Sequence, residues 1–126
     1  PDGAALAAAP GSGAGGGAGV VVLALGGRVL TGPEALGEIA DLDRTIAAAD
    51  LVVTGCDEFD VDVWGGPVVA HVVARANAAG RPVVVIARTN RTSLAGQREH
   101  GIEAVHAVGD GDITDGCLSF ARSWFW

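Results

Sequence analysis

Three apolar runs in the second half of the chain show no alternation between apolar and polar residues. They cover residues 51–54, 83–86 and 102–108, and segments with helical character separate them. Strands that are apolar on both sides and alternate with helices form parallel sheets with helices on both faces. We therefore predict an α/β fold, with a parallel-sheet, flavodoxin- or Rossmann-like three-layer half in the order βαβαβα.

Apolar residues spaced three or four positions apart, and glycines at the ends of such segments, indicate helices around these strands. The expected helices cover residues 34–40, 41–49, 67–79, 93–100 and 115–122. A Gly-rich loop occupies the start of the chain. We therefore divide the chain into residues 1–49, a Gly-rich loop with a helical segment, and residues 50–126, a flavodoxin-like α/β segment. Together these segments are expected to form one structural unit.

The charged residues exclude several classes of function. The 126-residue chain has a formal net charge of −7, and its eight basic residues are all arginines. Such an acidic protein repels nucleic acid and anionic membrane surfaces, so we expect neither as a partner. Because lysine is absent, a Walker-type phosphate loop, the protein-kinase catalytic lysine and Schiff-base chemistry are excluded. With no signal peptide, membrane span or CxxC pair in the sequence, we expect a reduced, cytoplasmic protein, and the composition suggests a bacterial one.

The Gly-rich run from Pro10 to Gly19 is a candidate anion-binding loop. It contains the Gly-x-Gly-x-x-Gly spacing of a dinucleotide fingerprint, but that fingerprint needs a strand directly before it, and Pro10 fits poorly at a strand end. Glycine amides can nevertheless approach an anion closely, and a following helix would add its positive end. The alternative is a flexible connector. The candidate phosphate-binding residues are Gly11, Ser12, Gly13, Gly15, Gly16 and Gly17.

Four carboxylates lie in the segment that follows the first predicted strand, residues 55–62. Ligands of open α/β sheets bind beyond the carboxyl ends of the strands. Asp57, Asp60 and Asp62 could hold Mg²⁺ through one or two carboxylates while a nucleotide supplies the other oxygens. The alternative interpretation is a solvated acidic loop.

Residues 88–93 follow the second predicted strand and contain two arginines. The guanidinium groups of Arg88 and Arg91 are suitable partners for phosphate or carboxylate. The alternative is a loop that caps the next helix, with Thr92 or Ser93 at the N-cap. At the end of the chain, Trp124, Phe125 and Trp126 are expected to dock against the core of this domain, against another chain, or against further protein that this sequence does not include.

Three stretches carry a family resemblance. They are Pro10-Gly-Ser-Gly-Ala-Gly-Gly-Gly-Ala-Gly19 with the apolar run after it, Leu42-Asp-Arg-Thr-Ile-Ala-Ala-Ala-Asp-Leu-Val-Val-Thr-Gly55, and Val73-Ala-Arg-Ala-Asn-Ala-Ala-Gly-Arg-Pro-Val-Val-Val-Ile-Ala87. In this order they resemble the C-terminal portion of the type I glycerate kinase family, over about residues 1–108. The resemblance implies that residues 20–25 form a helix and that the chain is part of a larger kinase-type fold.

The resemblance also implies an activity. Family members are ATP-dependent kinases that phosphorylate a glycerate hydroxyl, with ATP and Mg²⁺, in a cleft between two interleaved α/β domains. The family carries Glu-Gly-Arg-x-Asp after Thr-Gly, whereas this chain has Cys56, Asp57, Glu58 and Phe59 before the retained Asp60. The resemblance therefore assigns the catalytic role to Asp60, which would serve the metal or the substrate hydroxyl.

The departures from the family pattern keep other functions open. Glu58 stands where the family has arginine, and the segment 65–67 lacks the family's lysine. The alternative is a catalytically inactive α/β binding or assembly module, in which Trp124, Phe125 and Trp126 form a homo-oligomer or partner contact. A third interpretation is a small flavodoxin-like nucleotide-binding protein.

Overall fold

The structure is a computed structural model that describes residues 2–124, so the predicted contacts of Phe125 and Trp126 lie outside the described residues. The chain divides into two compact units, residues 1–36 and residues 37–126. No helix within the described part of the chain is long and apolar enough to cross a membrane.

The first unit contains the Gly-rich run, which lies partly in a turn and partly in the helix that follows it. Helix α1 (Gly3–Ala8) begins at Asp2, whose side chain accepts a hydrogen bond from the amide of Ala4 at 3.1 Å, as expected of an N-cap. Helix α2 (Ala14–Ala24) contains three left-handed glycines at residues 15–17. The helix implied for residues 20–25 is confirmed up to Ala24.

Helix α3 (Gly32–Ile39) runs through the boundary between the two units. A capping box begins this helix: the amide and hydroxyl of Thr31 donate to Glu34 Oε2 at 2.7 and 2.9 Å, while the Glu34 amide donates weakly to Thr31 Oγ1 at 3.4 Å. Pro33 lies in the first turn, where its missing N–H costs nothing.

The second unit is an open parallel sheet between helices. Its elements are α4 (Leu42–Ala48), β1 (Val52–Phe59), α5 (Gly66–Ala78), β2 (Val83–Asn90), α6 (Leu94–Glu99), β3 (Ala104–Ala107) and α7 (Ile113–Ser123). The three strands pair in the order β1-β2-β3, and both pairings are parallel. The predicted α/β fold with a parallel sheet is therefore confirmed.

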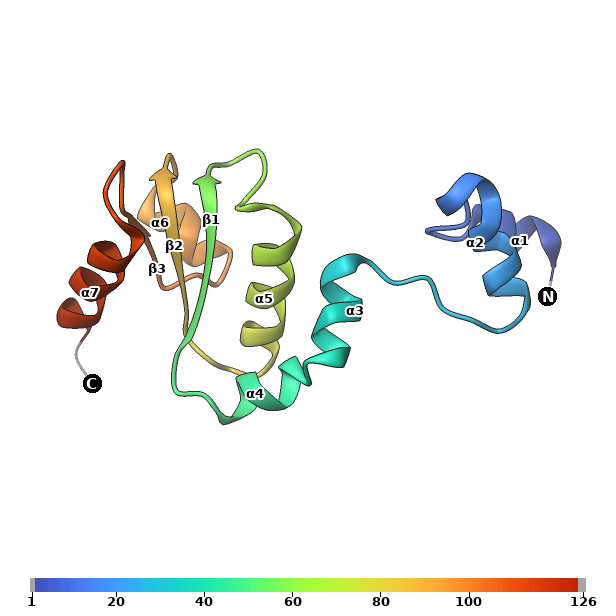
Figure 1. Ribbon diagram of the computed structural model, residues 1–126, viewed down its shortest axis with the longest axis horizontal. Helices are drawn as coiled ribbons and strands as arrows, with labels where there is room; N and C mark the ends of the chain where they lie inside the picture. The colour runs from blue at the N-terminus through green and yellow to red at the C-terminus, as the bar shows by residue number, and fades with distance from the viewer. Residues whose placement is uncertain (1, 125–126) are drawn as a thin grey trace. The chain divides into compact units, whose positions relative to one another are not determined.

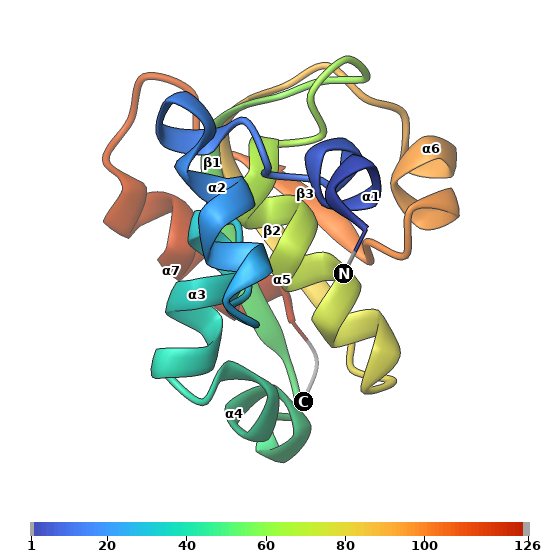
Figure 2. The same ribbon diagram turned by 90° about the vertical axis from the view of Figure 1, so that its right-hand side faces the viewer.

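Helices cover the two faces of the sheet unequally. Alternate residues of β2 point to opposite faces, so Val83 and Val85 pack with α5, while Ile86 points toward α7. Figure 1 shows α5 on one side of the strands and α7 on the other, and Figure 2 shows α5 in front of them. Val83 and Val85 are fully buried in the main core, which therefore lies between α5 and the sheet.

The strand boundaries differ from the sequence prediction. β1 continues past Thr54 to Phe59, and β2 continues past Ile86 to Asn90, so much of the two predicted polar loops is strand. The Phe59 side chain is fully buried, which holds the end of β1 on the sheet although carboxylates precede it. β3 is shorter than predicted, because residues 102, 103 and 108 lie outside the strand.

Candidate functional site

Asp57 and Arg88 face each other near the carboxyl ends of β1 and β2. The register that pairs Cys56 with Ala87 and Glu58 with Thr89 places them opposite one another. Arg88 Nε donates to Asp57 Oδ1 at 2.5 Å, and this hydrogen bond, followed by the charge of Asp57, raises the pKa of Arg88. The structure thus brings together one predicted phosphate-binding residue and one predicted metal ligand.

Arg91 is paired with a different carboxylate. Its Nη2 lies 3.5 Å from Glu58 Oε1, and its backbone amide donates to the Phe59 carbonyl oxygen at 2.8 Å. Successive residues of a strand point to opposite faces, so Glu58 leaves β1 on the face opposite to Asp57. Each of the two candidate arginines therefore has a carboxylate partner of its own.

Asp60 organises the turn that follows β1. Its Oδ1 accepts hydrogen bonds from the amides of Asp62 at 3.0 Å and Val63 at 3.1 Å, and its carbonyl oxygen accepts one from the Trp64 amide at 3.0 Å. Asp62 is exposed in the same turn. The carboxylate of Asp60 therefore has a fixed orientation, which a catalytic or metal-binding group needs.

The carboxylates of this segment suit a metal ion only in a limited way. No three His, Cys, Asp or Glu side chains come together as a metal site anywhere in residues 2–124. Asp57 is engaged with Arg88, and one oxygen of Asp60 is engaged with backbone amides. Mg²⁺ commonly takes one or two protein carboxylates and completes its shell with phosphate oxygens and water, so a metal ion here would need most of its ligands from outside these carboxylates.

A cavity of about 400 Å³ lies at the same edge of the sheet. Cys56 and Asp57 of β1 and Arg88 of β2 line it, together with Gly109 and Gly111 from the segment between β3 and α7. The sequence analysis missed these two glycines. Glycines between a strand and a helix are the signal that could have found them, because they let the backbone approach a ligand.

Cys56 is the nucleophilic side chain in this cavity, but its environment makes it inert. Burial, followed by the charges of Asp57 and Asp60, raises the pKa of its thiol above the ordinary value. Because the thiolate is the reactive form, this thiol is protonated at neutral pH. Covalent catalysis by Cys56 is therefore unsupported.

Of the predicted residues of the first unit, Gly11, Ser12 and Gly13 lie in the turn between α1 and α2, and the glycines at residues 15–17 lie within α2. Gly11 has a φ of +82°, and a Cβ there would lie 2.4 Å from Val29 Cγ1. The hydroxyl of Ser12 donates to the Ala7 carbonyl oxygen at 2.7 Å, and the amide of Gly17 donates to the Gly13 carbonyl oxygen at 3.2 Å. Local packing and hydrogen bonding therefore account for part of the glycine content of this run.

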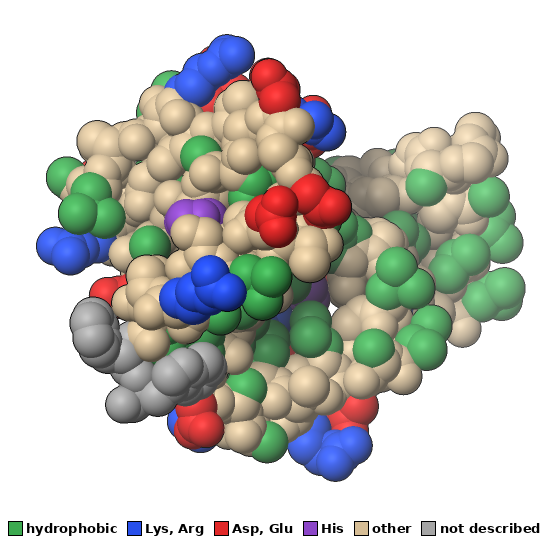
Figure 3. Space-filling model, turned by 60° about the vertical axis from the view of Figure 1, so that its left-hand side comes forward, with side chains coloured by type: hydrophobic (Ala, Val, Ile, Leu, Met, Phe, Trp, Pro, Cys, Tyr) green, Lys and Arg blue, Asp and Glu red, His purple; other side chains and the backbone are tan. Residues whose placement is uncertain are grey.

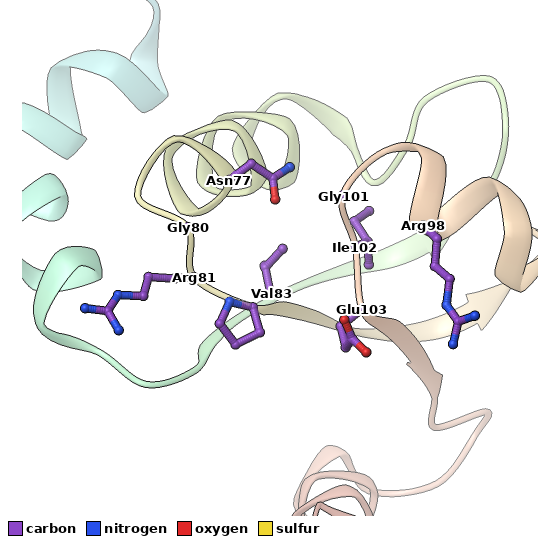
Figure 4. Close-up of a pocket in the computed structure, with 9 residues that line it drawn as sticks. Asn77, Gly80, Arg81, Val83, Arg98, Gly101, Ile102 and Glu103 are labelled. Carbon is purple, nitrogen blue, oxygen red and sulfur yellow. The ribbon is translucent and has the colours of Figure 1, made fainter.

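A second cavity, of about 450 Å³, lies at the amino ends of the strands. Arg81 and Arg98 line it, but Figure 4 shows them at opposite ends of the cavity, with side chains that do not point toward one another. Arg81 Nη2 donates to the Ala47 carbonyl oxygen at 2.5 Å. Because the two cations do not converge, this cavity is not built for a single anion.

Charged side chains are dispersed over the face that Figure 3 brings forward. On the side that Figure 3 brings forward, acidic and basic side chains are interspersed with apolar ones. No large basic patch is visible in that view, which agrees with the negative net charge.

Comparison with known proteins gives a consistent picture. Residues 2–121 match the family model of the glycerate kinase family. Two uncharacterized proteins, from Mycobacterium bovis and Mycobacterium tuberculosis, are each 34% identical over 108 residues, which is 86% of this chain and 28% of the relative. The crystal structure of "putative glycerate kinase 2" from Salmonella typhimurium LT2 has 24% sequence identity and a TM-score of 0.56, and the likeness covers 91% of this chain and 33% of that one. The chain therefore spans about three tenths of the length of these relatives.

Proposed function

The chain belongs to the glycerate kinase family, and on that premise we propose that it contributes to the ATP-dependent phosphorylation of a glycerate hydroxyl. The observation that carries the proposal is the family match over residues 2–121, nearly the whole chain. The substrate is then a small molecule, and ATP and Mg²⁺ are the cofactors.

We assign the reaction to the carboxyl ends of β1 and β2. Open α/β sheets bind ligands beyond the carboxyl ends of their strands, and the cavity beside Asp57 and Arg88 lies there. Its volume of about 400 Å³ falls in the usual range for small-molecule sites. Arg88 and Arg91 would bind the phosphate or carboxylate groups. The Gly-rich run, with Gly11, Ser12, Gly13, Gly15, Gly16 and Gly17, would bind an anion through its backbone amides.

Asp60 is the proposed catalytic residue. Two backbone amides fix its carboxylate, so it could hold Mg²⁺ or accept the proton of the substrate hydroxyl. Asp62 would be a second ligand of the metal. Asp57 would become a third ligand once its ion pair with Arg88 is broken. Bound with ATP, Mg²⁺ supplies positive charge that neutralises the phosphate groups.

The test measures ADP formation by the purified chain with ATP, Mg²⁺ and either isomer of glycerate. We expect glycerate-dependent turnover, and we expect Asp60→Asn to lower the rate by about 100-fold or more. Asp50→Asn removes the same charge from an exposed position before β1 and serves as the matched control. Two results would contradict the assignment of Asp60 as the catalytic residue of a glycerate kinase. One is ADP formation at the same rate with and without glycerate, and the other is an Asp60→Asn variant as active as the control.

A catalytically inactive binding or assembly module is the second candidate, and one observation favours it. Asp57 and Glu58 pair with the two arginines of the site, although phosphoryl transfer requires cations that face the phosphate. The Trp124 ring packs on Phe120, with centroids 5.5 Å apart, and would contribute to the contact. This candidate predicts no ADP formation, together with a salt-resistant dimer that dissociates when residues 124–126 are deleted.

A further inference from the structure

Three aspartates of this chain, at positions 2, 110 and 115, are directly followed by glycine. Such a pair rearranges without an enzyme, because glycine has no Cβ to keep its backbone nitrogen away from the preceding carboxyl group. In a folded protein the reaction needs a free carboxyl group, a glycine amide without a hydrogen bond, and a backbone that can turn to bring the two together. The structure shows which of the three pairs meets these conditions.

The pair Asp110–Gly111 meets all of them. It lies between β3 and α7, in a segment that Figure 1 shows as a loop beyond the arrowheads of β1 and β2. Both residues are exposed, and among residues 2–124 no hydrogen bond uses the Gly111 amide as donor or the Asp110 carboxylate as acceptor. The amides of Val108 and Gly109, in contrast, donate to the carbonyl oxygens of residues 87 and 88, each at 2.9 Å. The free pair therefore follows directly after an anchored stretch of backbone.

The other two pairs are held in place. The Asp2 carboxylate accepts the Ala4 amide at 3.1 Å as the N-cap of α1. Asp115 and Gly116 lie within α7, where the Gly116 amide donates to the Asp112 carbonyl oxygen at 3.2 Å. Ring closure would have to turn this peptide plane out of the helical ψ and break that bond. The pair within α7 thus has the same two residues as Asp110–Gly111 in a protected setting.

We propose that Asp110–Gly111 is a modification site, at which spontaneous isomerisation to isoaspartate remodels the wall of the cavity that contains Arg88. The proposal does not depend on the kinase activity proposed above.

The reaction consumes nothing and returns the water that it releases. The Gly111 backbone nitrogen forms a bond to Cγ of Asp110, and its proton leaves with the carboxyl hydroxyl as water. This closes a five-membered succinimide ring. Water then breaks one of the two bonds from the ring nitrogen to a carbonyl carbon. Breaking the new bond restores aspartate, and breaking the original peptide bond gives isoaspartate, with the main chain running through the former side chain.

The position of the pair gives the modification its effect. Gly109 and Gly111 line the cavity together with Arg88. The pKa of Arg88 is raised mainly by Asp57 and to a smaller extent by the charge of Asp110, so the Asp110 carboxylate acts on this guanidinium. Isomerisation adds a methylene to the main chain and moves the carboxylate to the α-carbon. The Gly109 amide and the Asp112 cap of α7 fix the segment on either side, so the added length displaces the cavity wall.

The first test compares the two pairs in the same molecule. The purified chain is incubated at physiological temperature and about pH 6, where part of the aspartate carries the proton that leaves with the water. Electron-transfer fragmentation in a mass spectrometer then measures isoaspartate at each position. We expect residue 110 to react at least about tenfold faster than residue 115, because a hydrogen-bonded helical amide reacts only when the helix opens locally. In urea that unfolds the chain, the two positions should react at similar rates.

Two substitutions separate the chemistry from its effect on the cavity. Gly111→Ala places a Cβ beside the attacking nitrogen, 3.3 Å from the Val108 carbonyl oxygen in this exposed segment, and should slow the reaction at residue 110 by about tenfold or more. Asp110→Glu keeps the negative charge and would need a six-membered ring, so it should form no such product. In NMR spectra, the Nε–H signal of Arg88 should shift as isoaspartate accumulates in the original chain and stay constant in Asp110→Glu.

Three results overturn the proposal. The first is equal isoaspartate formation at residues 110 and 115 in the folded chain. The second is a Gly111→Ala variant that isomerises as fast as the original chain. The third is an Arg88 Nε–H signal that does not move while isoaspartate accumulates at residue 110, which would show that the modification leaves the cavity unchanged.

Discussion

The indole ring of Trp64 lies stacked on the imidazole ring of His100, with ring centroids 3.5 Å apart and planes inclined by 17°. Trp64 belongs to the turn after β1 and also meets the buried ring of Phe59 edge-on, at 5.7 Å. His100 caps the end of α6. The stack therefore joins the turn that contains Asp60 to a helix that is distant in sequence.

Removing the imidazole should weaken this connection. We predict that His100→Ala lowers the free energy of unfolding by about 1 kcal/mol, the usual contribution of a well-packed aromatic pair. Urea denaturation at neutral pH measures the change. Glu99→Ala, an exposed substitution one residue earlier, is the control and should stay within about 0.5 kcal/mol of the original chain. Equal unfolding midpoints for the two variants would show that the stack contributes nothing.

Gly101 should tolerate alanine poorly because of Asn77. Gly101 has a φ of +70°, and a Cβ there would lie 2.1 Å from Asn77 Nδ2. Asn77 would have to move and lose its 3.3 Å hydrogen bond to the His100 carbonyl oxygen. We predict that Gly101→Ala costs about 1–2 kcal/mol for the left-handed backbone and about 1 kcal/mol more for the displaced amide.

Gly80 provides the matched control for this prediction. Its φ is +64°, but no atom lies within 4 Å of a Cβ built there, so Gly80→Ala should cost the backbone contribution alone. Replacing Asn77 by alanine should remove the excess cost of Gly101→Ala. Thermal or urea unfolding of the four variants completes the cycle. An excess that survives in the Asn77→Ala background would mean that another contact causes it.

The ion pair between Asp43 and Arg75 should make stability depend on acid pH. Arg75 Nε donates to Asp43 Oδ1 at 2.5 Å, and its Nη2 contacts the second carboxylate oxygen, so α4 is tied to α5. This hydrogen bonding lowers the pKa of Asp43 below its ordinary value. A lowered pKa in the folded state stabilises the protein above the unfolded pKa, near 4, and the contribution disappears as the pH falls through the folded pKa.

We therefore predict that the original chain loses more stability than Asp43→Asn when the pH falls from about 6 to about 3. Urea unfolding midpoints at several pH values measure this. Asp50→Asn removes the same charge at an exposed position, so this variant should lose as much stability as the original chain between about pH 6 and pH 3. Parallel pH profiles for the original chain and Asp43→Asn would contradict the prediction.

Periodicity predicts the apolar halves of β1 and β2 and misses their charged halves. A run of carboxylates after an apolar segment is typical of a loop, yet Asp57 lies within a strand because Arg88 stands opposite it in the register. That partner is 31 residues away, and no local pattern contains it. The family resemblance locates Asp60 but gives no sign of the two ion pairs at this edge.

The buried Gln97 shows a second limit of sequence reasoning. Only 4% of this residue is exposed, although a glutamine in a short helix is usually taken to face solvent. Its Nε2 donates to Thr92 Oγ1 at 3.0 Å, and its Oε1 accepts from the Val105 amide at 3.1 Å. Thr92 lies just before the same helix, but Val105 belongs to β3, so the contact of Gln97 with the sheet follows from the tertiary structure.

The pair of Asp57 and Arg88 allows a prediction about anion binding. While Asp57 accepts the Nε hydrogen of Arg88, its negative charge partly neutralises the guanidinium and one hydrogen-bond donor is unavailable to a ligand. We predict that Asp57→Asn tightens the binding of inorganic phosphate by up to about fivefold, because an exposed ion pair is worth at most about 1 kcal/mol. Titration of labelled chain by NMR, in the absence of metal, measures the dissociation constant and the residues that respond. Asp50→Asn makes the same change in net charge at the far end of β1. An equal increase in phosphate affinity in the two variants would therefore mean that the change in net charge alone causes it. A gain confined to Asp57→Asn and abolished by adding Arg88→Gln would instead identify Asp57 as the group with which the ligand competes.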